Sequence, residues 1–280
     1  MDWIDRMNQA LSYVEENLDG EISFERAARI AYSSQYQFQR LFSYMVGIPL
    51  AAYIRQRRLT KAAFDLQGGD RVIDVSARYG YDSPTAFNRA FQSIHGVTPT
   101  AARKPDTVLK SFPRVSFQIT IKGAAEMEYR IVSKDAFRIV GVREPISTDA
   151  EENFKCVPEF WQRTAPLIPK ICALMNAEPM GLLGASVADG EDENFYYIAS
   201  ATDMPVPEGM YESVIPASTW AIFTGSGSPG SIADLQRRVF SEWLPTSGYE
   251  WATSADIEVY LNDDPVDMKY EVWLPIVKKA

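Results

Sequence analysis

An internal repeat in the first hundred residues constrains the fold of this 280-residue chain more than any other feature. Ser34 and Gly47 recur as Ser83 and Gly96, an offset of 49 residues in both cases. Between these ends each copy repeats an arginine flanked by two phenylalanines, as Phe38, Arg40 and Phe42 and again as Phe87, Arg89 and Phe91. Phenylalanines four residues apart lie on one face of a helix. The repeat therefore predicts two helix-turn-helix units whose aromatic pairs are core.

Turn signals divide the same stretch into short helices, with almost no strand-like alternation. The longest uninterrupted helical pattern runs from about Leu50 to Leu66 and stops at Gly68-Gly69. We expect an all-α double helix-turn-helix domain over residues 1–104.

The charge is distributed unevenly along the chain. The net charge is −9, but residues 1–104 hold 13 Lys/Arg and 11 Asp/Glu, whereas residues 105–280 hold 15 and 26. No acidic residue occurs between Arg26 and Phe64, a stretch that contains seven basic ones. This basic stretch suits contact with nucleic-acid phosphate, although a solvated helix face would show the same pattern.

The rare residue types exclude several kinds of site. Cys156 and Cys172 are the only cysteines and lack metal-type spacing. His95 is the only histidine, which leaves no histidine-based metal cluster and disfavours a Ser-His-Asp triad. No apolar run reaches the roughly 18 residues that span a bilayer, and the N-terminus lacks the pattern of a signal peptide. We expect a cytoplasmic protein with no metal, no cofactor and no catalytic site.

The segment from Val72 to Arg103 carries a longer ordered pattern: a helix, Gly-Tyr, a capping serine, Phe-x-Arg-x-Phe, and Gly-x-x-Pro followed by an arginine four residues on. It resembles the signature of the AraC/XylS family of bacterial transcription regulators. In that family a long helix holds two recognition helices in successive major-groove segments of promoter DNA. The resemblance thus implies promoter DNA as a partner, with RNA polymerase as a further candidate, and it covers about the first 104 residues.

Carried over by position, the resemblance assigns base reading to three residues in each unit. These are Tyr36, Gln39 and Arg40 in the first, and Thr85, Asn88 and Arg89 in the second. A guanidinium can pair with guanine through two hydrogen bonds, which suits the two arginines. Arg57 and Arg58, in the basic stretch, are expected to reach phosphate. Gln92 and Ser93 occupy positions where the family usually carries basic residues. We therefore expect the second unit to bind DNA phosphate more weakly.

Residues 105–124, with several prolines and glycines, are predicted to form a linker. Residues 125–280 then mix strands with helices and show a fainter repeat, in which Met127, Val132 and Phe137 recur 83 residues later as Met210, Ile215 and Trp220. Two strand–helix–strand–strand modules related by a pseudo-twofold axis are predicted. They would build one antiparallel sheet with helices on one face, an α+β domain.

Alternation along the last two strands suggests a site. Over residues 256–261 the apolar residues alternate onto one face of the strand, so Glu258 and Tyr260 lie on the opposite face. Over residues 269–276 the same alternation places Glu271 and Trp273 together on the face opposite the apolar residues. We expect these four side chains to share one surface, in a cleft where Gly184 in the other module leaves room opposite Glu258. A solvated face with scattered aromatics is the plainer alternative.

This half resembles the gyrase-inhibitor-like effector-binding domain. The resemblance rests on the strand order and on two short segments, Ile257-Glu258-Val259-Tyr260 and the closing Tyr270-Glu271-Val272-Trp273-Leu274-Pro275. The resemblance implies glutamates at 258 and 271 that meet cationic, flat or apolar ligands among aromatic rings. The ring candidates are Trp273, Tyr260 and Tyr196, then Trp220 and Phe223; Trp161, Trp243 and Phe240 are expected in the core.

Two other functions stay open at this point. Some relatives of such a domain are similar to small hydrolases, in which Glu258 would act as a general base with Tyr260. The C-terminal half could instead dock a protein partner. The effector, the promoter, the direction of regulation and the oligomeric state do not follow from the sequence.

Overall fold

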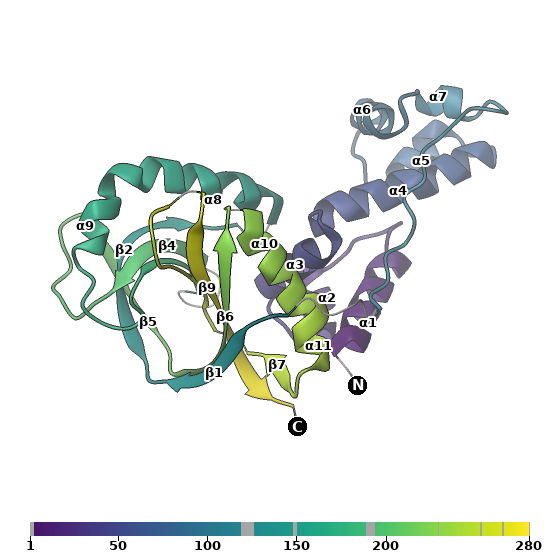
Figure 1. Cartoon of the computed structure of the whole chain (residues 1–280). Coiled ribbons are helices and arrows are strands. Elements are labelled where there is room, and N and C mark those ends of the chain that lie inside the picture. Colours follow the sequence, from purple (N-terminus) through teal and green to yellow (C-terminus); the bar gives the residue numbers. More distant parts are fainter. Residues whose placement is uncertain are drawn as a thin grey trace. The chain divides into compact units, whose positions relative to one another are not determined.

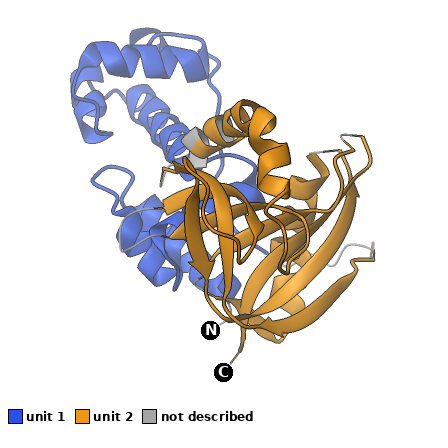
Figure 2. Cartoon of the chain, turned by 90° about the vertical axis from the view of Figure 1, so that its left-hand side faces the viewer, with its two compact units in different colours: residues 1–118 blue, residues 119–280 orange. Residues whose placement is uncertain are grey.

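The computed structural model of the chain describes residues 3–118, 126–147, 150–188, 194–228, 230–252, 254–264 and 266–279. The chain divides into two compact units, Met1–Gln118 and Ile119–Ala280 (Figure 2). Within the described ranges, no helix has both the length and the apolar character that a membrane crossing requires.

Unit 1 is all helical, as expected, and contains two helix-turn-helix pairs (Figure 1). The pairs are α2 with α3 and α5 with α6, and the long helix α4 connects them. The helices are α1 (Trp3–Glu16), α2 (Phe24–Ile30), α3 (Gln35–Val46), α4 (Leu50–Gln67), α5 (Val72–Arg78), α6 (Pro84–His95) and α7 (Pro99–Ala102).

The repeated serines and glycines mark the ends of α3 and α6. The Ser34 hydroxyl accepts from the Gln37 amide, and the Ser83 hydroxyl accepts from the Ala86 amide, so each serine caps an otherwise unpaired donor of the first turn. At the other ends Gly47 (φ 79°) and Gly96 (φ 76°) adopt the left-handed conformation that stops a helix. The repeat therefore encodes two equivalent helix boundaries.

The repeated aromatic pairs form the core of unit 1, as predicted. All four phenylalanines of the two pairs are fully buried. In the second helix-turn-helix they pack with α4 and α5 through Leu59, Leu66 and Val75. Phe91 also packs against His95 in a tilted arrangement, with ring centroids 4.3 Å apart.

The start of the expected linker is instead part of unit 1. Residues 110–117, here called the strap, run over the helices and are hydrogen-bonded at each end. Asn8 on α1 exchanges two bonds with the backbone of Phe117, at 2.8 and 2.9 Å. At the other end the Lys110 amide donates to His95 Nδ1 at 3.2 Å. A 105–124 linker was thus wrong for these residues, because side chains of α1, α4 and α6 satisfy the backbone of the strap.

The lone histidine belongs to this structural network. His95 is buried, and its Nε2 lies 3.1 Å from the Leu59 carbonyl oxygen, which fits a neutral ring that donates at Nε2 and accepts at Nδ1. Burial lowers the pKa of His95, in keeping with that neutral form.

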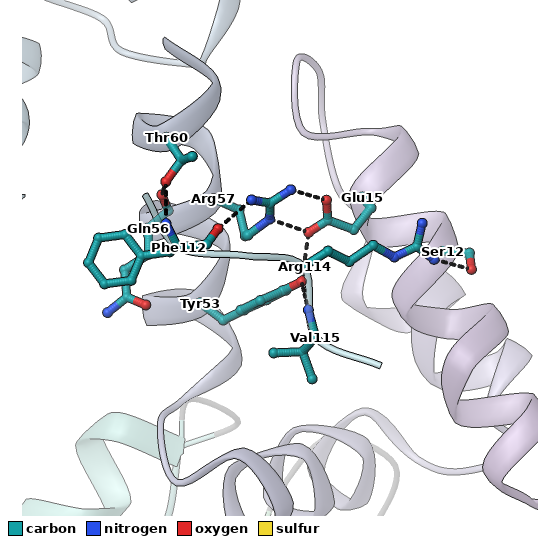
Figure 3. Close-up of polar contacts among 9 residues, drawn as sticks. All are labelled: Ser12, Glu15, Tyr53, Gln56, Arg57, Thr60, Phe112, Arg114 and Val115. Atoms are coloured by element: carbon teal, nitrogen blue, oxygen red, sulfur yellow. Dashed lines mark hydrogen bonds and ion pairs between the residues drawn. The ribbon is translucent and has the colours of Figure 1, made fainter. Parts of the chain in front are cut away.

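A buried ion pair joins α1 to α4 beneath the strap (Figure 3). Arg57 contacts both oxygens of Glu15, with Nε–Oε1 at 2.8 Å and Nη2–Oε2 at 2.9 Å, and it also donates to the Phe112 carbonyl oxygen. The side chains are 12% and 6% exposed. The Tyr53 hydroxyl donates to Glu15 at 2.7 Å and accepts from the Val115 amide at 3.1 Å.

The pKa values of this network reflect burial and hydrogen bonding. Burial alone would raise the pKa of Glu15, but the hydrogen bonds from Arg57 and Tyr53 outweigh it and the pKa lies below its ordinary value. Burial and the bond to the Glu15 carboxylate raise the pKa of Tyr53 to about 12. Glu15 is therefore held as a carboxylate in the folded state.

Over the described residues, unit 2 is built on one antiparallel nine-stranded sheet, the α+β architecture expected. The strands are β1 (Tyr129–Lys134), β2 (Phe137–Pro145), β3 (Leu182–Ala188), β4 (Asn194–Ala201), β5 (Tyr211–Ile215), β6 (Ser218–Gly227), β7 (Tyr249–Trp251), β8 (Asp256–Tyr260) and β9 (Met268–Lys278). The helical segments are α8 (Ala150–Thr164), η1 (Ala165–Leu167), α9 (Ile168–Cys172), α10 (Gly230–Arg238), the π-helix η2 (Val239–Trp243) and α11 (Leu244–Thr246).

The strand order shows the pseudo-twofold repeat. It is β1-β6-β9-β8-β3-β4-β2-β5, with β7 paired to β9, so the modules β6-β9-β8 and β2-β4-β3 meet where β8 pairs with β3. The outer strands are exchanged, since β1 pairs with β6 of the second module and β5 pairs with β2 of the first. Helices α8 and α9 contact β4, and α10 contacts β6 and β9.

The sheet is strongly curled (Figure 1). Its face that does not meet the helices is buried inside this curl. The rings of Phe137 on β2 and Trp273 on β9 meet edge to face, 6.5 Å apart, although three strands separate β2 from β9 in the sheet order. Trp220, Ile257 and Leu183 belong to the same buried cluster. Unit 2 thus has two layers of side chains, one inside the curl and one beneath the helices.

The Glu15–Arg57 pair yields a stability prediction. Glu15→Gln should lower the free energy of unfolding by about 3 kcal/mol, because it leaves a buried guanidinium without its counter-charge. Urea denaturation of the full chain would measure the loss, and amide hydrogen exchange would locate it in α1 and α4. Glu16→Gln, at the exposed neighbouring position, is the matched control.

The same carboxylate sets a pH dependence. Since folding lowers the pKa of Glu15, its contribution to stability is present above the ordinary carboxyl value near 4.5 and is lost as the pH falls through the folded value. The stability difference between wild type and Glu15→Gln should therefore narrow in acid. A difference that is the same at pH 7 and pH 3 would contradict this role.

Candidate functional site

Helix α3, the first predicted recognition helix, carries Arg40 between two tyrosines of the same helix. Arg40 Nε donates to the Tyr44 hydroxyl at 2.8 Å, and Nη1 donates to the Tyr36 hydroxyl at 3.4 Å. Gln39 does not have the surface position that base reading requires: it is buried, because it follows core Phe38 and lies one turn before the buried Ser43. Of the three base-reading candidates, Tyr36 and Arg40 contact each other and Gln39 is set apart.

Helix α6, the second predicted recognition helix, exposes its candidates more than α3 does. Thr85 and Arg89 are exposed and Asn88 is half-buried. Asn88 Oδ1 accepts from Gln92 Nε2 at 3.5 Å, one turn further along. The structure places all three candidates on one helix, away from the buried Phe87 and Phe91.

Arg57 and Arg58 were expected to reach phosphate, and the structure contradicts this. Arg57 is held by Glu15, and Arg58 donates to the carbonyl oxygens of Leu18 at 2.9 Å and Gly20 at 2.6 Å. Burial lowers the pKa of Arg58. Their partners lie about 40 positions earlier in the chain, so charge counting along the sequence could not reveal them. Arg55, on the same helix, is exposed.

The centre of the candidate effector site in unit 2 is the carboxylate of Glu258 on β8. Its Oε2 accepts from the Tyr260 hydroxyl at 2.9 Å and from the Tyr196 hydroxyl at 3.4 Å. Its Oε1 accepts from Gln236 Nε2 at 2.9 Å, which ties the carboxylate to α10. We call Glu258, Tyr260, Tyr196, Gln236 and Trp161 the Glu258 cluster.

Trp161 belongs to this cluster and not to the core, contrary to expectation. From α8 its Nε1 donates to the Tyr196 hydroxyl at 3.1 Å, and its ring meets the Tyr260 ring edge to face at 5.0 Å. Trp161 and Gln236 lie on helices of different modules. Helix α10 contacts the carboxylate directly through Gln236, whereas α8 is linked to it through the Tyr196 hydroxyl. No local sequence signal identifies either residue, because helical periodicity alone does not distinguish a polar contact at the end of a side chain from core packing.

Gly184 lies opposite Glu258 in the β3–β8 pairing, as predicted, but the room it leaves is occupied. A Cβ at this position would lie 2.3 Å from the Tyr196 hydroxyl oxygen and 3.3 Å from Glu258 Oε2. The absence of a side chain at Gly184 is therefore what lets the tyrosine hydroxyl approach the carboxylate.

Glu271 and Trp273 were expected on the same surface as Glu258, and this was wrong. Across β8 and β9 the register pairs Glu258 with Val272 and Ile257 with Trp273. Directly paired residues point to the same face of a sheet, so Glu271 and Trp273 lie inside the curl. Alternation identifies the two faces of each strand, but only the register determines which faces coincide.

Inside the curl these residues have structural partners. Trp273 Nε1 donates to Glu271 Oε2 at 2.8 Å, and Arg130 donates to Glu271 Oε1 at 2.8 Å. Trp273 is buried and packs against Trp220 with centroids 5.7 Å apart. Phe223, the other ring candidate, is on the opposite face beneath Trp243, at 5.0 Å.

The electrostatics around Glu258 differ from those around Glu15 and Glu271. Glu15 and Glu271 each face an arginine, whereas the hydrogen-bond partners of Glu258 are a carboxamide and two phenols, all neutral. No lysine or arginine of the described ranges pairs with it. Those ranges also hold no group of three or more His, Cys, Asp or Glu that could bind a metal.

Two protein-family models match the chain. Residues 127–277 match the GyrI-like small molecule binding domain, and residues 27–105 match a helix-turn-helix domain. The chain is 26% identical to the right origin-binding protein of Escherichia coli (strain K12) and 25% identical to the transcriptional regulator Rob of Salmonella typhimurium. Each of these alignments covers 99% of both chains.

A third relative matches the helical unit alone. The chain is 34% identical over 102 residues to the HTH-type transcriptional activator AarP of Providencia stuartii, covering 36% of this chain and 76% of that protein. Combined with the two unit folds, these matches confirm both predicted families: the chain belongs to the GyrI-like small molecule binding domain family and is a DNA-binding, AraC-type transcription regulator.

Proposed function

We propose that this regulator senses a lipophilic or flat aromatic cation, which binds at the Glu258 cluster and alters transcription from the promoters that unit 1 recognises. The observation that carries the proposal is a half-buried carboxylate whose hydrogen-bond partners are all neutral and whose neighbours are aromatic.

The chemistry of the cluster favours a cation. Three neutral donors stabilise Glu258 as an anion without cancelling its charge. A bound cation would supply the missing counter-charge, and the faces of Trp161, Tyr260 and Tyr196 would add cation–π attraction and apolar contact area. Because Glu271 and Trp273 lie on the other face of the sheet, neither is part of the proposed site.

For unit 1 we propose that Arg40 and Arg89 read bases, with Tyr36, Thr85 and Asn88 beside them. The exposed Arg55 replaces Arg57 and Arg58 as the candidate for phosphate contact on α4. A protein with this function would act in the bacterial cytoplasm on double-stranded promoter DNA, together with RNA polymerase. Residues 1–104 as the DNA-binding part and 125–280 as the effector-binding part remain proposed boundaries.

Arg40→Ala should reduce affinity in a sequence-dependent way. On a duplex selected from a random library by the wild-type protein, we expect a loss of about 1–3 kcal/mol, since a two-bond contact to guanine is removed. On random duplexes the change should be small. Fluorescence anisotropy on both duplexes measures the difference.

Arg55→Ala is the matched control for the DNA experiment. It should weaken binding to all sequences similarly and lower the magnitude of the salt slope by about one, as loss of a phosphate contact does. Equal losses on selected and random duplexes for Arg40→Ala would refute base reading by Arg40.

Glu258→Gln should weaken binding of a lipophilic cation at least about tenfold, roughly 1.4 kcal/mol, because the amide keeps the shape but not the charge. Methyltriphenylphosphonium and the neutral triphenylphosphine oxide form a suitable pair of ligands for calorimetric titration of the full chain. The neutral compound should be affected less than threefold, on the order of half a kcal/mol.

Two further variants sharpen this test. Gly184→Ala should weaken both ligands, since the new methyl group displaces the Tyr196 hydroxyl. Glu271→Gln, inside the curl, should leave both affinities unchanged. If Glu258→Gln bound the cation as well as wild type does, the effector site would lie elsewhere, and a protein-docking role for unit 2 would become the better account.

We also propose that the chain is not an enzyme, although Tyr260 and Glu258 are hydrogen-bonded as a hydrolytic pair would be. Helix α10 is hydrogen-bonded to the carboxylate through Gln236, and α8 is linked to it through the Tyr196 hydroxyl, which suits reporting occupancy better than activating water. Wild type and Glu258→Gln should therefore hydrolyse an electrophilic ester such as p-nitrophenyl acetate at the same background rate. Turnover that depends on Glu258 would favour the hydrolase instead.

A further inference from the structure

We propose that Tyr44 is a positioning residue for DNA recognition: it holds the Arg40 guanidinium in the orientation that reads a base. This inference rests on the proposed base reading by Arg40 and adds a residue that the repeat and the family resemblance did not indicate. Tyr44 itself need not touch DNA.

The geometry on α3 supports this role. Tyr36, Arg40 and Tyr44 are spaced four residues apart, so they form one row along the helix surface. Arg40 Cζ lies 5.8 Å from the Tyr36 ring centroid and 5.3 Å from that of Tyr44. The two hydrogen bonds differ, at 2.8 Å from Nε to Tyr44 and 3.4 Å from Nη1 to Tyr36. The shorter hydrogen bond indicates that Tyr44 restrains the Arg40 side chain more strongly than Tyr36 does.

Holding the arginine matters because its side chain is long. Fixing a free arginine in one rotamer costs up to about 2 kcal/mol of conformational entropy, which lowers the affinity of any contact it makes. A side chain already fixed by a hydrogen bond and two ring faces loses less on binding. The guanidinium has five N–H donors, and pairing with guanine uses only two neighbouring ones. The terminal Nη1 and Nη2 groups can therefore contact guanine while Nε stays bonded to Tyr44.

The second recognition helix lacks this arrangement. At the offset of 49 residues, Tyr36 and Tyr44 correspond to Thr85 and Ser93, so neither turn beside Arg89 carries a ring. Ser93 donates its hydroxyl to the Ala90 carbonyl oxygen. The repeat therefore conserves the arginine between the two helices but not the tyrosines that contact it in α3. We infer that the base preference of the first unit is sharper than that of the second.

The test compares base preference in three variants of the full chain. Selection from a random duplex library gives the preferred sequence of the wild type, and Arg40→Ala identifies the base position that Arg40 reads. Tyr44→Phe keeps the ring and removes only the hydroxyl. We expect it to broaden preference at that same position and to weaken the selected duplex about 3- to 10-fold, which lies within the range for loss of one typical hydrogen bond.

Affinity for random duplexes and the salt slope should not change in Tyr44→Phe, because no phosphate contact is removed. Ser93→Ala, at the equivalent place beside Arg89, is the control and should leave preference intact at every position. Circular dichroism and urea denaturation would establish that both variants fold as the wild type does.

The outcomes separate this inference from the proposal on which it rests. If Arg40→Ala broadens one position and Tyr44→Phe leaves that position sharp, the positioning role is overturned and base reading by Arg40 stands. Equal losses on selected and random duplexes for Tyr44→Phe would also overturn it, since they would indicate a general structural effect. If Arg40→Ala changes no position, the base-reading assignment itself has failed.

Discussion

The charge of Arg57 is buried in unit 1, and the packing of that unit is arranged around it. The guanidinium contacts both oxygens of Glu15 and the backbone of the strap, so one side chain joins α1, α4 and residues 110–117. A buried charge of this kind is tolerated only when its hydrogen-bonding capacity is met. The Tyr53 hydroxyl completes the arrangement by bridging Glu15 to Val115. The helix that connects the two helix-turn-helix units is thereby fixed to its neighbours along one side.

In unit 2 the corresponding constraint is the register of β8 between β3 and β9. It places Glu258 beneath the helices, opposite Gly184, and turns Glu271 into the curl beside Arg130. The two glutamates, only 13 positions apart, thus have opposite electrostatic settings. One is neutralised by an arginine and stabilises the sheet, while the other keeps an uncancelled charge and is the better candidate for recognition.

The parts of this architecture that were predictable from the sequence are those that repeat or that depend on neighbouring residues. The serine and glycine of each copy predicted the ends of α3 and α6, and the aromatic pairs predicted the core. The alternation of apolar and polar residues along β8 correctly predicted that Tyr260 and Glu258 share one face of the strand. What could not be predicted depends on contacts between distant residues. The partner of Arg57 is 42 positions away, and Trp161 and Gln236 reach the Glu258 cluster from separate helices.

The exchanged outer strands of the sheet have a consequence for how this domain could have arisen. Because β1 pairs with β6 and β5 pairs with β2, each module completes the edge of the other. A single module on its own would expose an open strand edge, and a second copy would supply the missing strand. The arrangement is that of a strand-swapped homodimer joined into one polypeptide. Gly184 of one half and Glu258 of the other then face each other across the two central strands where the modules meet.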